Sequence, residues 1–136
     1  MRIMAIDYGD ARIGLAVSDM LGFMCGEAWT MNEWNMERAI ERITEEAKMR
    51  GVERFVLGLP KNMDGSEGPR AAISRELAAK LETLSGLPVT LWDERRSSIE
   101  AHAILHAGGK KEKQHRKTVD AVAASLILEG YLDSMK

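Results

Sequence analysis

Two short apolar runs separated by a turn open the chain, and this pattern limits the folds it can adopt. Residues 1–6 and 12–18 have the length and composition of buried strands, and Gly9 lies in the turn between them. The runs are therefore expected to form an antiparallel hairpin. Asp7 ends the first run, where a buried charge without a partner would cost several kcal/mol. A turn aspartate bonded to the backbone and a carboxylate that binds a cation both fit this place.

Hydrophobic periodicity and turn residues predict the remaining elements. Strands are expected at about 2–7, 12–18, 23–30, 54–59 and 88–92, and helices at about 33–50, 67–85, 97–107 and 118–134. Asn32 is the expected N-cap of the first helix, and Gly51 and Gly86 are expected to end the first and second helices. The inward faces are predicted to be Met36, Ile40, Ile43 and Ala47 in the first helix, and Ile73, Leu77, Leu81 and Leu84 in the second.

This order of elements predicts an α/β fold. Consecutive hairpins make the first three strands antiparallel, and the later strand–helix–strand crossovers add parallel strands. The five-stranded sheet is therefore mixed, with helices on both faces. A chain of 136 residues suits one domain over residues 1–136.

Composition narrows the class of protein. With 45% hydrophobic and 29% charged residues, the chain is typical of a soluble globular domain and not of a disordered one. No apolar run reaches the roughly 18 residues of a membrane span, so no membrane partner is expected. The single cysteine, Cys25, excludes an internal disulfide, and no zinc-ligand spacing is present. A reducing, cytoplasmic setting is the expectation.

Positive charge is concentrated in one stretch. Net charge is −2, which argues against a generally basic nucleic-acid binder, yet residues 110–117 hold five Lys or Arg and one Glu. This stretch is expected to belong to a loop, residues 108–117, between the last two helices. It could be a solvated connector or a contact for phosphates.

Two further sets of acidic residues change the interpretation of Asp7. Asp93 and Glu94 follow the fifth strand, and ligands of open sheets bind beyond the carboxyl ends of parallel strands. Only one of the two is expected to reach the side of Asp7, because successive strand residues point to opposite faces. Asp120 lies in the apolar last helix. The acids near helix starts could also serve only the helix dipole, with Thr118 as a cap.

Three carboxylates from distant segments are the donors that a divalent cation needs. Mg²⁺ and Mn²⁺ are hard ions that prefer carboxylate oxygen and retain water. Two such ions about 3.5–4 Å apart can bind one phosphodiester and activate a water. The sequence therefore predicts Mg²⁺ or Mn²⁺ as the cofactor.

Four motifs carry a resemblance to a known family. Residues 7–19 (DYGDARIGLAVSD), 58–66 (GLPKNMDGS), 93–95 (DER) and 117–124 (KTVDAVAA) resemble, in order, those of the YqgF/RuvX family of RNase H-like nucleases. The resemblance implies an RNase H-like fold. It also implies that Asp7, Glu94 and Asp120 are catalytic residues and metal ligands.

The resemblance implies a metal-dependent endonuclease that hydrolyses phosphodiester bonds at the 5′ end of pre-16S rRNA during ribosome biogenesis. Alternatives are a Holliday junction resolvase acting on branched DNA and a non-catalytic RNA-binding assembly factor. A sugar-kinase or actin-like ATPase also opens with an Asp-x-Gly hairpin, but it needs two such domains. The partners implied are structured RNA or branched DNA and ribosomal precursor particles, and both a monomer and a homodimer remain open.

Basic side chains near the acidic residues are the candidates for phosphate contacts. Such contacts need Lys or Arg, although a lysine is as often only a solvated surface charge. The candidates are Arg12, Lys61 and Arg95, together with Lys110, Lys111 and Lys113 of the basic stretch.

Overall fold

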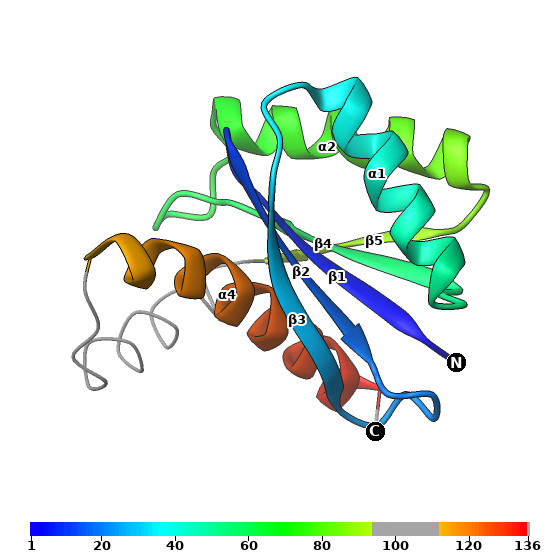
Figure 1. The fold of residues 1–136 in the computed structure, drawn as a ribbon. Coiled ribbons are helices and arrows are strands. Elements are labelled where there is room, and N and C mark those ends of the chain that lie inside the picture. Colours follow the sequence, from blue (N-terminus) through cyan, green and yellow to red (C-terminus); the bar gives the residue numbers. More distant parts are fainter. Residues whose placement is uncertain (94–111, 136) are drawn as a thin grey trace.

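A five-stranded sheet with helices on both faces forms the protein (Figure 1). The computed structural model describes residues 1–93 and 112–135. The strands are β1 (Ile3–Tyr8), β2 (Arg12–Ser18), β3 (Cys25–Asn32), β4 (Arg54–Leu59) and β5 (Val89–Asp93). The helices are α1 (Met36–Met49), α2 (Pro69–Ser85) and α4 (Glu112–Ser134). The predicted helix at 97–107 lies outside the described residues.

The sheet is mixed, as predicted. Its strand order is β3-β2-β1-β4-β5. β1 pairs antiparallel with β2, and β2 pairs antiparallel with β3, whereas β1–β4 and β4–β5 are parallel. The carboxyl ends of β1, β4 and β5 therefore meet at one edge.

Two apolar cores lie on opposite faces of this sheet. Helices α1 and α2 cover one face, and α4 covers the other (Figure 1). Strand alternation divides the side chains between the cores. Met4 and Ile6 of β1 enter the core under α1 and α2, whereas Ile3 and Ala5 enter the core under α4. The same alternation places Asp7 on the α4 face.

Helix α1 follows the predicted pattern except at its cap. Ile40, Ile43 and Ala47 are buried. The prediction that Asn32 caps the helix is wrong, because Asn32 still belongs to β3, where it pairs with Arg12 of β2. Asn35 caps the helix instead, and its side chain accepts a hydrogen bond of 3.0 Å from the backbone N–H of Arg38.

Helix α2 uses a different face from the predicted one. Gly86 ends it in the left-handed conformation, as predicted, and Leu77 and Leu81 are buried. Ile73 and Leu84, however, are 40% and 54% exposed. The helix rests on the sheet through the side that also carries the small residues Ala71 and Ser74, which allow close packing. This rotation leaves Ile73 and Leu84 outside the core.

Helix α4 begins earlier than predicted. It starts at Glu112 rather than near residue 118, so residues 112–117 of the basic stretch are helical and not part of a loop. Lys, Glu, Gln and Arg are good helix formers, and together they extend the apolar helix backwards by more than a turn. Among the described helices, none combines the length and apolar composition that a membrane span requires.

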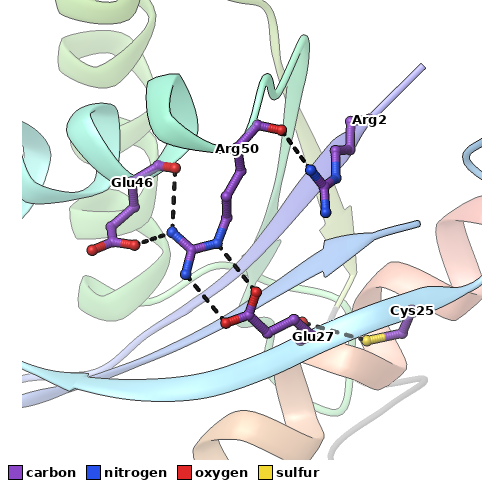
Figure 2. Close-up of polar contacts among 5 residues, drawn as sticks. All are labelled: Arg2, Cys25, Glu27, Glu46 and Arg50. Carbon is purple, nitrogen blue, oxygen red and sulfur yellow. Dashed lines mark hydrogen bonds and ion pairs between the residues drawn. The ribbon is translucent and has the colours of Figure 1, made fainter. Parts of the chain in front are cut away.

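A network around Arg50 fastens the edge strand β3 to the end of α1 (Figure 2). The Arg50 guanidinium donates to both carboxylate oxygens of Glu27, at 3.3 and 3.2 Å, and also to Glu46 one turn earlier. It lies 4.2 Å from the ring centroid of Trp29. Arg2 donates to the Arg50 carbonyl at 2.8 Å. The planar fork of arginine suits this combination of contacts, which holds β3 beside the rest of the sheet.

Candidate functional site

The candidate site lies at the edge where three parallel strands end. Ile6 of β1 is level with Leu57 of β4, and Leu59 is level with Asp93 of β5. Asp7 follows Ile6 and is partly buried on the α4 face. Gly58 follows Leu57 and contributes no side chain to the site. The edge therefore offers the Asp7 carboxylate to a ligand beyond the strand ends.

Gly14 brings the last helix against Asp7. Asp7 and Gly14 are direct partners in the β1–β2 ladder, so both present the same face of the sheet. A Cβ atom built on Gly14 would lie 1.9 Å from the carbonyl oxygen of Asp120 and 2.5 Å from its carbonyl carbon. The α4 backbone thus rests directly on Gly14, and this contact places Asp120 beside Asp7.

The charge of Asp120 is only partly compensated. Its side chain is 18% exposed. Burial raises the pKa of the Asp120 carboxyl, and the nearby charge of Asp7 raises it further, while Arg12 acts in the opposite direction. Two carboxylates that repel each other in a partly buried place fit a hard divalent cation, which would remove that repulsion. The donor chemistry present therefore agrees with Mg²⁺ or Mn²⁺.

The third predicted ligand, Glu94, lies outside the described residues. Within residues 1–93 and 112–135, no three His, Cys, Asp or Glu side chains gather as a metal site. Asp93 ends β5 one residue after Trp92, which packs edge-on against Tyr131 in the α4-side core at a centroid distance of 6.0 Å. By alternation, Asp93 belongs to the opposite face from Trp92 and Asp7.

The predicted phosphate contacts have different surroundings. Arg12 lies at the start of β2 and forms an ion pair with Asp120. Lys61 lies in the loop after β4, where the pKa of Glu67 is lowered by a hydrogen bond from Arg75 and also by the Lys61 charge. Arg95, Lys110 and Lys111 lie outside the described residues, and only the helical backbone of Lys113 is described.

Two residues that shape this edge of the sheet were not predicted from the sequence. Gly14 is one, although a glycine inside an apolar strand signals a close backbone approach. Arg70, in the first turn of α2, is the other. It donates to the carboxylate of Asp10 at 3.1 Å and to the carbonyl of Tyr8 at 3.3 Å, and so ties the β1–β2 turn to α2. No sequence pattern pointed to this contact.

Comparisons with known proteins identify the family of this chain. The family model RuvX, described as Holliday junction resolvase, matches residues 1–134. A protein of Symbiobacterium thermophilum is 40% identical over 134 residues, covering 98% of this chain and 93% of its own. One of Bacillus subtilis is 39% identical over 137 residues, covering 99% of both chains. Both carry the name "Putative pre-16S rRNA nuclease".

Two solved structures share the fold at low sequence identity. RuvC of T. thermophilus, in complex with a Holliday junction substrate, aligns with a TM-score of 0.64 at 13% identity, over 100% of this chain and 97% of its own. The fowlpox virus Holliday junction resolvase aligns with a TM-score of 0.61 at 16% identity, over 98% and 99%. These structures show the fold, and the family match extends over nearly the whole chain. The chain therefore belongs to the RuvX family, a family of nucleases with an RNase H-like fold.

Proposed function

We propose that this protein is a metal-dependent endonuclease that processes the 5′ end of pre-16S rRNA. The observation that carries the proposal is that the contact of α4 with Gly14 brings Asp120 beside Asp7, so that two carboxylates lie at the edge of the sheet where the parallel strands end. Phosphodiester hydrolysis in such a site needs a cation, since bare carboxylates repel phosphate. The names of the relatives at 39–40% identity support the choice of RNA.

Asp7, Glu94 and Asp120 are the proposed ligands for Mg²⁺ or Mn²⁺. Asp93 is the less suitable acid of its pair, because alternation after Trp92 assigns it to the other face of the sheet. When bound, a divalent cation there would supply Lewis-acid stabilisation of the phosphate charge and a water of lowered pKa. Asp7 and Asp120 would hold it between a strand end and a docked helix, two rigid elements.

Branched DNA is the second candidate substrate. The family description and the RuvC fold support it. RNA is favoured because the RuvC likeness is at 13% identity, whereas the relatives named for pre-16S rRNA match almost the whole chain at about three times that identity. A non-catalytic RNA-binding assembly factor is disfavoured, since a pure binder gains nothing from partly buried carboxylates that face phosphate.

The proposed partners are structured RNA and ribosomal precursor particles, in the cytoplasm. The only cysteine, Cys25, is a free thiol, which agrees with a reducing compartment. The protein could act as a monomer or a homodimer.

Cleavage by purified protein tests the proposed function. Wild-type protein with Mg²⁺ or Mn²⁺ is expected to cut precursor rRNA near its 5′ end, faster than it cuts a four-way DNA junction. The Asp7→Asn variant should be more than about 100-fold less active than the wild type. Removing a group that only orients a metal ligand already lowers metal affinity or activity by about 10–100-fold. Excess EDTA should have the same effect. Cleavage that survives both Asp7→Asn and EDTA would refute the metal mechanism, and preferential junction cleavage would make DNA the substrate.

The basic stretch is expected to follow the nucleic-acid backbone. If it neutralises phosphates, the logarithm of the binding constant falls with the logarithm of salt concentration, by about 0.7 per phosphate on single strands and 0.9 on duplex DNA. Replacing Lys110, Lys111 and Lys113 together with alanine should flatten this slope by up to roughly three such units. Fluorescence anisotropy over a salt series measures it. A slope and affinity equal to those of the wild type would show that the stretch is only a solvated surface segment.

A further inference from the structure

The ion pair between Arg12 and Asp120 is made by one nitrogen only. The Nε atom of Arg12 donates to Oδ2 of Asp120 at 3.0 Å, across 108 positions of the chain. The Arg12 side chain is 40% exposed and that of Asp120 is 18% exposed. The guanidinium therefore turns its inner edge towards the carboxylate, while a large part of the side chain faces solvent.

The terminal nitrogens of Arg12 remain available. In the part of the chain that the structure describes, Nε–Oδ2 is the only hydrogen bond or ion pair of this side chain. Arg50 provides the contrast, because its donors are taken up by Glu27 and Glu46. A guanidinium has five N–H donors, and its two terminal nitrogens match the geometry of two phosphate oxygens.

We propose that Arg12 joins the metal site to the substrate: its Nε orients the Asp120 carboxylate, and its terminal nitrogens bind a phosphate of the nucleic acid. This inference rests on the proposed function and assigns Arg12 a second task within it. Arg12 is then a positioning residue towards the cation and a contact residue towards the substrate. The Nε of Arg12 binds Oδ2 of Asp120, and the other carboxylate oxygen, Oδ1, remains for the cation.

Lysine and glutamine at position 12 separate the two tasks. Lysine keeps one positive charge, so it can still neutralise a phosphate, but a single ammonium lacks the rigid fork needed to hold Asp120 and a phosphate together. Glutamine removes the charge. Arg12→Lys should therefore weaken cation binding, whereas Arg12→Gln should also change the salt dependence of nucleic-acid binding.

Mn²⁺ binding without nucleic acid measures the positioning task. Isothermal titration of Mn²⁺ into Arg12→Lys should give an affinity about tenfold below that of the wild type, the scale found when a group that orients a metal ligand is lost. Because the charge at position 12 is kept, added electrostatic repulsion does not explain such a loss. An Mn²⁺ affinity equal to the wild-type value would overturn the positioning role.

RNA binding without metal measures the contact task. In EDTA, Arg12→Gln should make the salt slope for a labelled structured RNA less steep by about 0.7–0.9, the equivalent of one phosphate, while Arg12→Lys should keep the wild-type slope. An unchanged slope in Arg12→Gln would overturn the phosphate contact. A wild-type protein that binds neither Mn²⁺ nor RNA would overturn the proposed function itself, and this proposal with it.

Arg42 supplies a matched control. Its side chain is 47% exposed and forms one ion pair, of 3.2 Å, with Glu33, whose side chain is 12% exposed. Arg42 lies on α1, on the opposite face of the sheet from α4 (Figure 1). Arg42→Gln should leave both the Mn²⁺ affinity and the salt slope unchanged. Equal changes in this variant would show that the effects at position 12 are only those of net charge, which would overturn the proposal.

Discussion

Replacing Gly14 with alanine is expected to abolish cleavage and to destabilise the protein by at least about 1–3 kcal/mol, the usual cost of overpacking a core. The added Cβ would lie 1.9 Å from the Asp120 carbonyl oxygen. The obstacle is backbone, so no side chain can rotate out of the way. Relief requires α4 to move off β2, and this movement would carry Asp120 away from Asp7.

Urea unfolding and cleavage rate measure the two parts of this prediction. Gly26→Ala is the matched control, because Gly26 lies in the neighbouring strand β3. Its Cβ would be 3.4 Å or more from every atom outside Gly26 and its two chain neighbours, which is an ordinary contact. That variant should stay within about 0.5 kcal/mol of the wild type. Wild-type stability and activity in Gly14→Ala would show that α4 does not rest on β2 at this glycine.

The central strands β1, β2 and β4 were predictable because they are almost entirely buried, whereas the edge strand β3 is largely exposed. Strands covered by helices on both sides appear in the sequence as continuous apolar runs with turn residues at their ends. Residues 54–59 are an example, since the predicted and observed bounds of β4 are identical. Antiparallel and parallel pairing then followed from the lengths of the connections.

The helix faces were harder to predict, because packing distance matters as well as hydrophobicity. A search for large apolar residues selected Ile73 and Leu84 of α2, yet the helix turns Ala71 and Ser74 to the sheet. Small residues allow a close approach, and their signal is lost when only bulky side chains are counted. The early start of α4 was missed because charge suggested a loop, whereas helix propensity decided the conformation.

The site was predictable only as a set of separate acids. The sequence singled out Asp7 and Asp120, but their juxtaposition depends on the docking of α4 at Gly14, a contact between distant parts of the chain. The same holds for Arg12. A basic residue near an acidic cluster predicts a phosphate contact, but only the three-dimensional structure shows that it also holds Asp120.

Replacing Asp120 with asparagine is expected to remove cleavage while leaving the fold at least as stable when no metal is present. The loss of activity should exceed about 100-fold, because a proposed metal ligand is lost directly. Stability should not fall, because asparagine relieves the burial of a charge and its repulsion by Asp7. Arg12, whose side chain is 40% exposed, can turn its freed Nε to water.

The difference in stability between the wild type and Asp120→Asn should depend on pH, and this dependence identifies the Asp120 carboxyl as its cause. Burial and Asp7 raise the pKa of Asp120 above 3.8, its ordinary value, so the folded protein holds this proton more tightly than the unfolded chain does. The wild type should therefore lose stability relative to Asp120→Asn as pH rises from 3.8 through the raised folded value, and the difference should be constant at higher pH. Urea unfolding in EDTA across this range measures the difference.

Glu129→Gln is the control for the loss of activity, since Glu129 is an exposed carboxylate on the same helix. It should keep the wild-type cleavage activity, which would show that the loss in Asp120→Asn is not a general effect of removing a carboxylate from α4. If Asp120→Asn instead unfolds at clearly lower urea than the wild type at neutral pH, Asp120 stabilises α4 as a structural acid through its pair with Arg12. In that case, cation binding would no longer be needed to explain why Asp120 lies beside Asp7. The metal site would then have to be assigned from binding data alone.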